Sequence, residues 1–140
     1  MIFSLRRVRK SLSFLSIDSG RWEHLMSVGT FWRRNMQTFK IDDMKRGWFV
    51  GDFEPSAFKN PFFEVAHHKH PKGKGEPHYH KVTTELTYII EGEMLVSGQH
   101  LKAGDMWIYE QNEVADVENL TDVSLVVVRW PSVPSDKYLV

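Results

Sequence analysis

The chain has 140 residues, of which 41% are hydrophobic and 26% charged, and its formal net charge is zero. This length and composition are typical of one globular domain with its own apolar core, and they exclude wholesale disorder. The sequence contains no cysteine, which excludes disulfides, thiolate metal ligands and cysteine nucleophiles. No segment reaches the roughly 18 consecutive apolar residues that a membrane span needs, so we expect no membrane partner.

The neutral net charge conceals two oppositely charged parts. Residues 1–35 carry seven Lys or Arg against two acidic residues, whereas residues 36–140 carry 11 against 16. The second part is therefore acidic and lacks the basic face by which proteins bind nucleic acid. We expect no nucleic-acid partner.

The first 35 residues are treated as an extension that is poorly structured or short-helical. Residues 1–17 contain four basic residues, four serines and no acid. Three interpretations stay open: an organellar transit peptide, a secretory signal with a short apolar stretch, or an extension that arises from the choice of start codon. We expect a domain over residues 36–140 and a cytoplasmic protein, with organellar targeting by residues 1–35 as the alternative.

Residues 36–140 read as many short strands separated by turns, with no long helical pattern between them. This pattern predicts an all-β sandwich or barrel. Closing the sheet removes exposed strand edges and leaves a mouth suited to a ligand. The predicted strands are Gly47–Val50, Phe62–Ala66, Leu86–Ile90, Met94–Val96, Met106–Tyr109, Val114–Val117 and Ser124–Val128, and residues 70–75 are expected to form a solvated loop.

One group of residues points to chemistry. His78 and His80 are two apart, so on a strand both imidazoles project from the same face. Glu85 lies five residues further on and can reach the same point. Two neutral imidazoles and one carboxylate suit a divalent ion of Fe, Mn, Ni, Co or Zn, with positions left for water or substrate.

The spacing of these residues resembles the first motif of the cupin family, His-x-His, three or four residues, Glu, six residues, Gly. Here His78, His80, Glu85 and Gly92 agree at every step, although Gly73 lies one position too close for the glycine that opens the motif. The resemblance implies a single cupin-type jelly-roll β-barrel. It also implies a homodimer, because cupins commonly pair through their outer sheets.

A second cupin motif is matched only in part. Gly104, Asp105 and Asn119 are in register with it, but the turn lacks its usual proline and glycine. Ala115 occupies the place of the motif's His, which is usually the fourth metal ligand. Asp116 and Glu113 are the candidate replacements, and water or substrate is the alternative.

These observations predict a metal-binding cupin that acts on or senses a small polar metabolite through His78, His80 and Glu85. The run Phe49–Pro55 and the tail from Pro131 resemble small cupins found among polysaccharide and sugar-nucleotide genes, which implies a sugar or sugar nucleotide and isomerase-, epimerase- or oxygenase-like chemistry. Two alternatives stay open: a metal-free isomerase or epimerase with His78 and His80 as acid and base, and a non-catalytic binding barrel. The sequence leaves open whether the protein is an enzyme.

Overall fold

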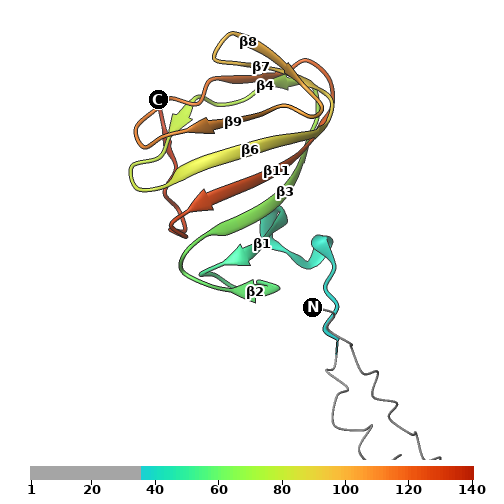
Figure 1. Cartoon of the computed structure of the whole chain (residues 1–140), viewed down its shortest axis with the longest axis vertical. Coiled ribbons are helices and arrows are strands. Elements are labelled where there is room, and N and C mark those ends of the chain that lie inside the picture. Colours follow the sequence, from blue (N-terminus) through green and yellow to red (C-terminus); the bar gives the residue numbers. More distant parts are fainter. Residues whose placement is uncertain (1–35) are drawn as a thin grey trace, which may run out of the picture. The chain divides into compact units, whose positions relative to one another are not determined.

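The computed structural model describes residues 36–140, and the expectations for residues 1–35 lie outside the described residues (Figure 1). The compact unit Thr38–Val140 is built almost entirely of strands. In this part of the chain, no helix is of a length and hydropathy that would cross a membrane.

Short strands follow two single-turn 3₁₀ helices, η2 (Ile41–Asp43) and η3 (Lys45–Gly47). The strands are β1 (Trp48–Gly51), β2 (Phe58–Lys59), β3 (Glu64–His70), β4 (Gly73–Lys74), β5 (His78–Tyr79), β6 (Thr84–Glu91), β7 (Glu93–Val96), β8 (Gln99–Lys102), β9 (Met106–Tyr109), β10 (Val117–Asn119), β11 (Val123–Trp130) and β12 (Tyr138–Leu139).

The strands form three sheets that curve into one barrel. Six strands run in the order β2-β1-β3-β11-β6-β9, four in the order β4-β10-β7-β8, and β12 pairs with β5. Strand β11 lies between β3 and β6, and Figure 1 shows the four-stranded sheet at the other side of the barrel from β1 and β2. This crossing of strands distant in sequence confirms the all-β jelly-roll prediction.

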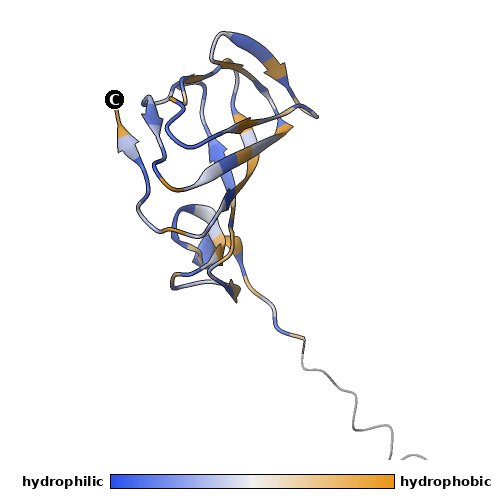
Figure 2. Ribbon diagram, turned by 60° about the vertical axis from the view of Figure 1, so that its left-hand side comes forward, coloured by the Kyte–Doolittle hydropathy of each residue, from blue (hydrophilic) through white to orange (hydrophobic). Residues whose placement is uncertain are grey.

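Alternation along the strands separates an interior from an exterior. Ala66, Ile89, Leu125 and Val127 are buried and belong to the core cluster. Figure 2 shows both hydrophobic and hydrophilic segments on the barrel strands. Burial alternates along β6, where Thr87 and Ile89 are buried and Tyr88 and Ile90 are exposed, as expected for side chains that point in turn to the two faces of a sheet. On β3 the even-numbered residues, like Ala66, therefore point into the barrel, and on β6 the odd-numbered residues, like Ile89, do so.

The predicted turns are present. Gly92 adopts φ 95° between β6 and β7, and a Cβ there would lie 2.4 Å from the carbonyl oxygen of Asp122, so only glycine fits. Ser97 and Gly98, with φ 48° and 80°, form the tight turn between β7 and β8.

The observed elements differ from the predicted ones at several places, and three of the differences have a clear local description. Strand β3 begins at Glu64 rather than at residue 62, because the Asn60 side chain accepts hydrogen bonds from the backbone N–H groups of Phe62 and Phe63. The expected solvated loop at residues 70–75 contains β4, which pairs with β10. Strand β10 begins at Val117 instead of at residue 114, since the preceding residues complete a turn in which Asn112 adopts φ 65°.

Candidate functional site

His78 and His80 lie together on the inner side of the barrel. His78 belongs to β5 and His80 follows it directly. Their ring centroids are 5.4 Å apart, with the ring planes at 84°. The structure thus places the two imidazoles side by side, as their spacing predicts.

The side chain of Glu85 on β6 reaches the imidazole of His80. Its Oε2 lies 3.3 Å from Nε2 of His80, and the hydroxyl of Thr87 donates a hydrogen bond of 3.3 Å to its Oε1. Thr87 is two residues along β6, so both side chains point into the barrel. The carboxylate is held by neighbours on both oxygens.

Backbone carbonyls orient both imidazoles. Nδ1 of His78 lies 3.0 Å from the carbonyl oxygen of Glu76, and Nδ1 of His80 is hydrogen-bonded to the carbonyl of Asp136. A carbonyl only accepts, so Nδ1 carries the proton in each ring and Nε2 is left with its lone pair when the ring is neutral. Nε2 of His80 is buried and faces the Glu85 carboxylate at 3.3 Å. This pattern is the one that histidines binding a metal through Nε2 usually show.

Asp136 also fixes the chain around His80. Its side chain accepts hydrogen bonds from the backbone N–H groups of Lys81, Val82 and Thr83 at 3.1, 2.9 and 2.8 Å. The residue is only 3% exposed. Burial raises the pKa of Asp136, but these hydrogen bonds outweigh it and hold the pKa below its usual value. Asp136 therefore joins the end of the chain to the segment that follows His80.

The contact between His80 and Glu85 changes the pKa of both groups. Burial lowers the pKa of His80, yet the hydrogen bonds to Glu85 and to the Asp136 carbonyl outweigh it, and the pKa is raised. Burial raises the pKa of Glu85, but the interaction with His80 and the positive charge of Arg129 lower it overall. In the absence of an ion, the pair favours an imidazolium and a carboxylate.

Arg129 on β11 supplies a fixed positive charge beside the site. It is paired in register with Glu64 on β3 and with Glu85 on β6. Its Nη2 lies 3.0 Å from Oε1 of Glu64, and its guanidinium lies over the ring of Trp48, 4.2 Å from the centroid. Arginine is thus held by a carboxylate and an aromatic face in the interior.

A third inward-pointing imidazole comes from β3. His68 shares the parity of Ala66, and its Nδ1 lies 3.2 Å from Nε2 of His70. Burial lowers the pKa of His68 to about 4, with the neighbouring His70 as the next cause. Its Nε2 is buried without a hydrogen-bond partner, as is Nε1 of Trp107, which lies opposite Thr87 on β9. Two polar side-chain atoms in this part of the barrel are thus without a hydrogen-bond partner in the described structure.

The second-motif residues are arranged differently. Ala115 is 4% exposed and lies opposite His78, forming an isolated antiparallel bridge. The Asp116 carboxylate lies 3.6 Å from Nζ of Lys74 on the outside, and the Glu113 carboxylate accepts a hydrogen bond from the N–H of Glu110. Neither of these two acids is joined to the imidazoles by a hydrogen bond or ion pair in the described structure.

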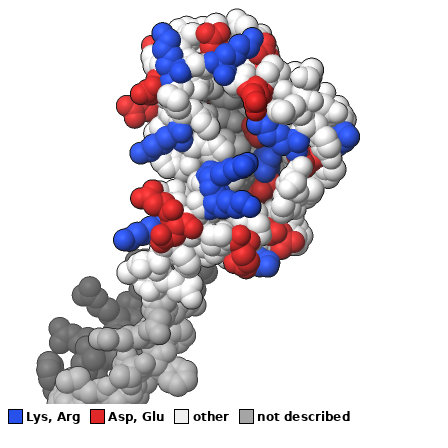
Figure 3. Space-filling view, turned by 180° about the vertical axis from the view of Figure 1, so that it is seen from behind, with Lys and Arg blue, Asp and Glu red and all other residues white. Residues whose placement is uncertain are grey.

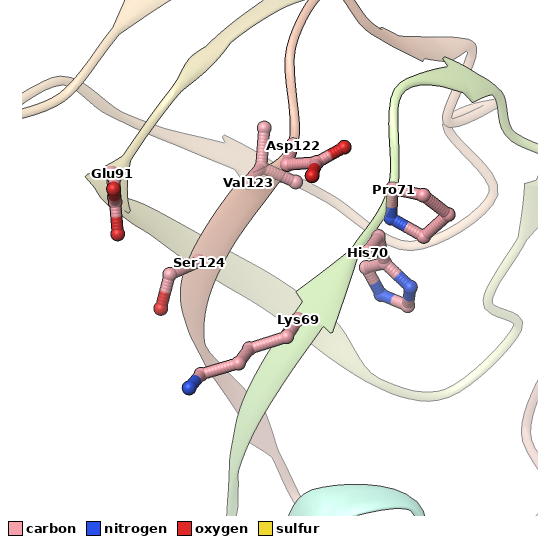
Figure 4. Close-up of a pocket in the computed structure, with 7 residues that line it drawn as sticks. All are labelled: Lys69, His70, Pro71, Glu91, Asp122, Val123 and Ser124. Atoms are coloured by element: carbon pink, nitrogen blue, oxygen red, sulfur yellow. The ribbon is translucent and has the colours of Figure 1, made fainter.

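Two open cavities lie outside the barrel interior. One of about 320 Å³ lies at the ends of β3 and β11, where the side chains of Lys69, Ser124 and Glu91 extend from one side of the strands (Figure 4). The other, of about 330 Å³, lies beside η2 and β1. His78, His80 and Glu85 line neither of them.

The sequence did not identify His68, Arg129 or Asp136 as parts of the site. The parity of His68 and His70 was a usable signal, because residues two apart on a strand share a face. The positions of Arg129 and Asp136 depend on pairing between strands that are distant in sequence, for which no local pattern exists.

The Cupin domain family model matches residues 66–130. No curated protein matches the chain. The structure is similar to a conserved protein with a double-stranded β-helix domain from Klebsiella pneumoniae, at 20% identity and a TM-score of 0.55, with 76% of this chain and 93% of that chain covered.

Two further solved structures are similar. Pac13, described as a nucleoside dehydratase, has 12% identity and a TM-score of 0.56, with 75% of this chain and 91% of that chain covered. KdgF from Halomonas sp. has 21% identity and a TM-score of 0.50, with 54% and 74% covered. At these identities the likenesses show the fold alone. The family match and the jelly roll together lead to one conclusion: residues 66–130 match a Cupin domain, and the described part of the chain has the fold that the resemblance to cupins implies.

Proposed function

We propose that this protein binds one divalent transition-metal ion through His78, His80 and Glu85 and acts on a small polar metabolite, such as a sugar or sugar nucleotide. The observation that carries the proposal is the orientation of the two imidazoles. Both Nδ1 atoms are engaged by backbone carbonyls, and Nε2 of His80 is buried and lies 3.3 Å from the carboxylate of Glu85.

The donor set fits such an ion in its chemistry. As the side chains stand, no three His, Asp or Glu residues between residues 36 and 140 form a ready metal cluster. His80 and Glu85 contact each other directly instead, which is the contact that an ion bound between them would replace. Two imidazoles and one carboxylate are suited to Fe, Mn, Ni, Co or Zn.

The chemistry that a bound ion supplies is Lewis acidity toward a carbonyl or hydroxyl oxygen of the ligand. The residues of the chain orient the ligand set and shape its surroundings. The carbonyls of Glu76 and Asp136 hold the imidazoles, Thr87 holds the carboxylate, and Arg129 provides a permanent positive charge beside Glu85.

Elemental analysis of the full chain, purified without chelators, tests this proposal. We expect close to one equivalent of transition metal in the wild type and none in His80→Ala or Glu85→Ala. His100→Ala is the matched control, because His100 and Glu93 form a His–Glu pair at 2.8 Å on the exposed surface. A wild-type protein that stays metal-free when offered each of the five ions would refute the proposal.

The direct contact of His80 with Glu85 favours a second candidate, a metal-free isomerase or epimerase. A histidine paired with a carboxylate can accept and return a proton near neutral pH. Chelator-treated protein should then exchange the proton on the carbon next to the carbonyl of a keto-sugar nucleotide with deuterated water. His80→Ala should abolish this exchange. If the exchange requires added metal, the first candidate is favoured.

We also propose that the protein is a homodimer and that it works in the cytoplasm. Four side chains on the outer face, Tyr88, Ile90, Met106 and Ile108, are between 36% and 59% exposed. They come from β6 and β9, which pair in register, and β9 is at the edge of its sheet. Two copies related by a twofold axis would cover this face with the same face of the partner.

A further inference from the structure

A bulge in β6 places a carboxylate on the outer face of the sheet, beside β11 and β3. The register between β11 and β6 shifts at this point: Leu125 lies opposite Ile89, whereas Ser124 lies opposite Glu91. Ile90 is therefore the extra residue of the bulge. In an unbroken ladder Ile90 would lie opposite Ser124, so the bulge puts a charged side chain where an apolar one would otherwise be.

Ser124 is the centre of three side chains from neighbouring strands, Lys69, Ser124 and Glu91, which we call the charged row. Lys69 on β3 lies opposite Ser124 on one side, and Glu91 on β6 lies opposite it on the other. The three side chains extend from one side of the strands (Figure 4). Neighbouring strands are about 4.8 Å apart, so the strands that carry the lysine and the glutamate are about 10 Å apart, with the serine between them.

Both charged ends of the row lack a partner. The ion pairs among residues 36–140 include Lys59 and Lys74, but neither Lys69 nor Glu91. Charges of both signs are mixed over the surface seen from behind (Figure 3), so charged ligands are selected there by local arrangements of side chains and not by a field of one sign. The charged row is such an arrangement, with one free charge of each sign.

The row lines the open cavity of about 320 Å³ at the ends of β3 and β11, and the rest of the wall is made by His70, Pro71, Asp122 and Val123. Oδ1 of Asp122 accepts a hydrogen bond of 2.9 Å from the N–H of Lys72, which ties the turn after β3 to the residue before β11. Ligand cavities in proteins span about 300 to 1,000 Å³. This one is at the lower end of that range and suits a small metabolite.

The Ser124 hydroxyl lies at the floor of the cavity and is held in place. Ser124 is 8% exposed, and its Oγ lies 2.8 Å from Nε2 of His67. If the imidazole donates this hydrogen bond, the hydroxyl proton stays free for a ligand. If the imidazole accepts it, the lone pairs of the oxygen stay free. In either case the hydroxyl can form one more hydrogen bond, midway between the two charges.

We propose that the charged row binds a small zwitterion, such as an amino acid, on the outside of the barrel. The Lys69 ammonium binds the carboxylate of the ligand, the Glu91 carboxylate binds its ammonium, and the Ser124 hydroxyl hydrogen-bonds to the ligand between them. A ligand with one charge would leave either the lysine or the glutamate unpaired. The site goes beyond the proposed function and does not depend on it, because none of the three proposed metal ligands lines this cavity.

Binding of five probes to the full chain tests the site. Glycine, β-alanine and 4-aminobutanoate are zwitterions of increasing charge separation, whereas acetate and methylammonium carry one charge each. Amide chemical shifts of residues 91 and 122–124 at low ionic strength report binding. We expect at least one zwitterion to bind about tenfold more tightly than either singly charged probe, because it makes two charge-assisted contacts where they make one.

Substitutions at the two ends of the row test each contact. Lys69→Gln and Glu91→Gln should each weaken binding of that zwitterion about tenfold, and Lys69→Arg should preserve it because the charge is retained. The matched controls are Lys59→Gln and Glu93→Gln, at exposed residues that do not line the cavity, and they should leave binding unchanged. All of these residues are exposed, so each variant should keep the wild-type Tm, which separates lost binding from lost folding.

Three results would overturn the inference. The first is the absence of binding by all three zwitterions. The second is binding of acetate or methylammonium as tight as that of the best zwitterion, which would show a site for a single charge. The third is equal binding of that zwitterion by the wild type and by Lys69→Gln or Glu91→Gln, or equal losses in these variants and in their controls.

Discussion

His78 and Ala115 face each other across an isolated antiparallel bridge, joined by backbone hydrogen bonds of 3.3 and 2.7 Å. Opposed residues in such a pair direct their Cβ atoms to the same side. The small side chain of Ala115 therefore lies next to an imidazole, at the position where the cupin motif carries another histidine.

Ala115→His is expected to add a fourth ligand. With one more imidazole beside His78, the affinity for zinc or manganese should rise at least about tenfold, because a further ligand contributes well over 1.4 kcal/mol. Competition with a chromophoric chelator measures the change. Ala103→His, which places a histidine in the exposed β8–β9 turn, is the control and should leave the affinity unchanged. The same affinity in both variants would show that position 115 does not face the ion.

Asp136→Asn should destabilise the fold and the site together. The substitution removes the charge that three backbone N–H groups of residues 81–83 share, and we expect a loss of about 2 kcal/mol in the free energy of unfolding. Urea denaturation measures it. Asp122→Asn is the comparison, since Asp122 accepts one exposed hydrogen bond from the N–H of Lys72 and should cost under about 1 kcal/mol. Similar losses in the two variants would contradict the role of Asp136 as a clamp.

His68 should make the fold sensitive to mild acid. Its pKa falls from 6.5 in the unfolded chain to about 4 in the folded protein, so the unfolded state binds the proton more readily. The stability that the neutral ring contributes is fully present above pH 6.5 and is lost as the pH falls toward 4, up to about 3 kcal/mol.

The variant His68→Gln isolates this contribution. Burial also lowers the pKa of His70 and His78, so wild type and variant both lose stability on acidification, but the wild type should lose more between pH 6.5 and 4. The pKa of Asp136 is lowered from 3.8, which places its effect at more acid pH. Parallel stability curves for the two proteins, or a pKa of 6 or above for His68 by NMR, would contradict the prediction.

Ile108→Glu should separate the proposed dimer into monomers. Ile108 is 48% exposed and lies opposite Leu86 in the pairing of β9 with β6, so a charge there would be buried without a partner at a dimer interface. Light scattering coupled to size exclusion gives the mass of each species. Val114→Glu, at a residue that is 45% exposed in the turn after β9, should stay dimeric. A monomeric wild type at micromolar concentration would rule out a stable dimer.

The sequence determined the barrel and the first half of the site by itself. Alternating apolar residues and the turns at Gly92 and Gly98 set the strands, because both depend on the preferences of neighbouring residues. The same local rule placed His78 and His80 on one face and brought Glu85 within reach. The resemblance to the cupin motif, and not the alternation, identified Ala115 as a departure from that motif.

Only the tertiary structure decided what surrounds these residues. Strand pairing between β3, β11 and β6 placed Arg129 between Glu64 and Glu85, and the pairing of β12 with β5 brought the carbonyl of Asp136 to His80. Hydrogen bonds between strands are made by backbone groups, which are nearly the same at every residue. The identity of the residues in a strand therefore seldom specifies which distant strand it pairs with. The partners are selected by closure of the whole barrel, which buries one apolar face and leaves its polar neighbours at the opening.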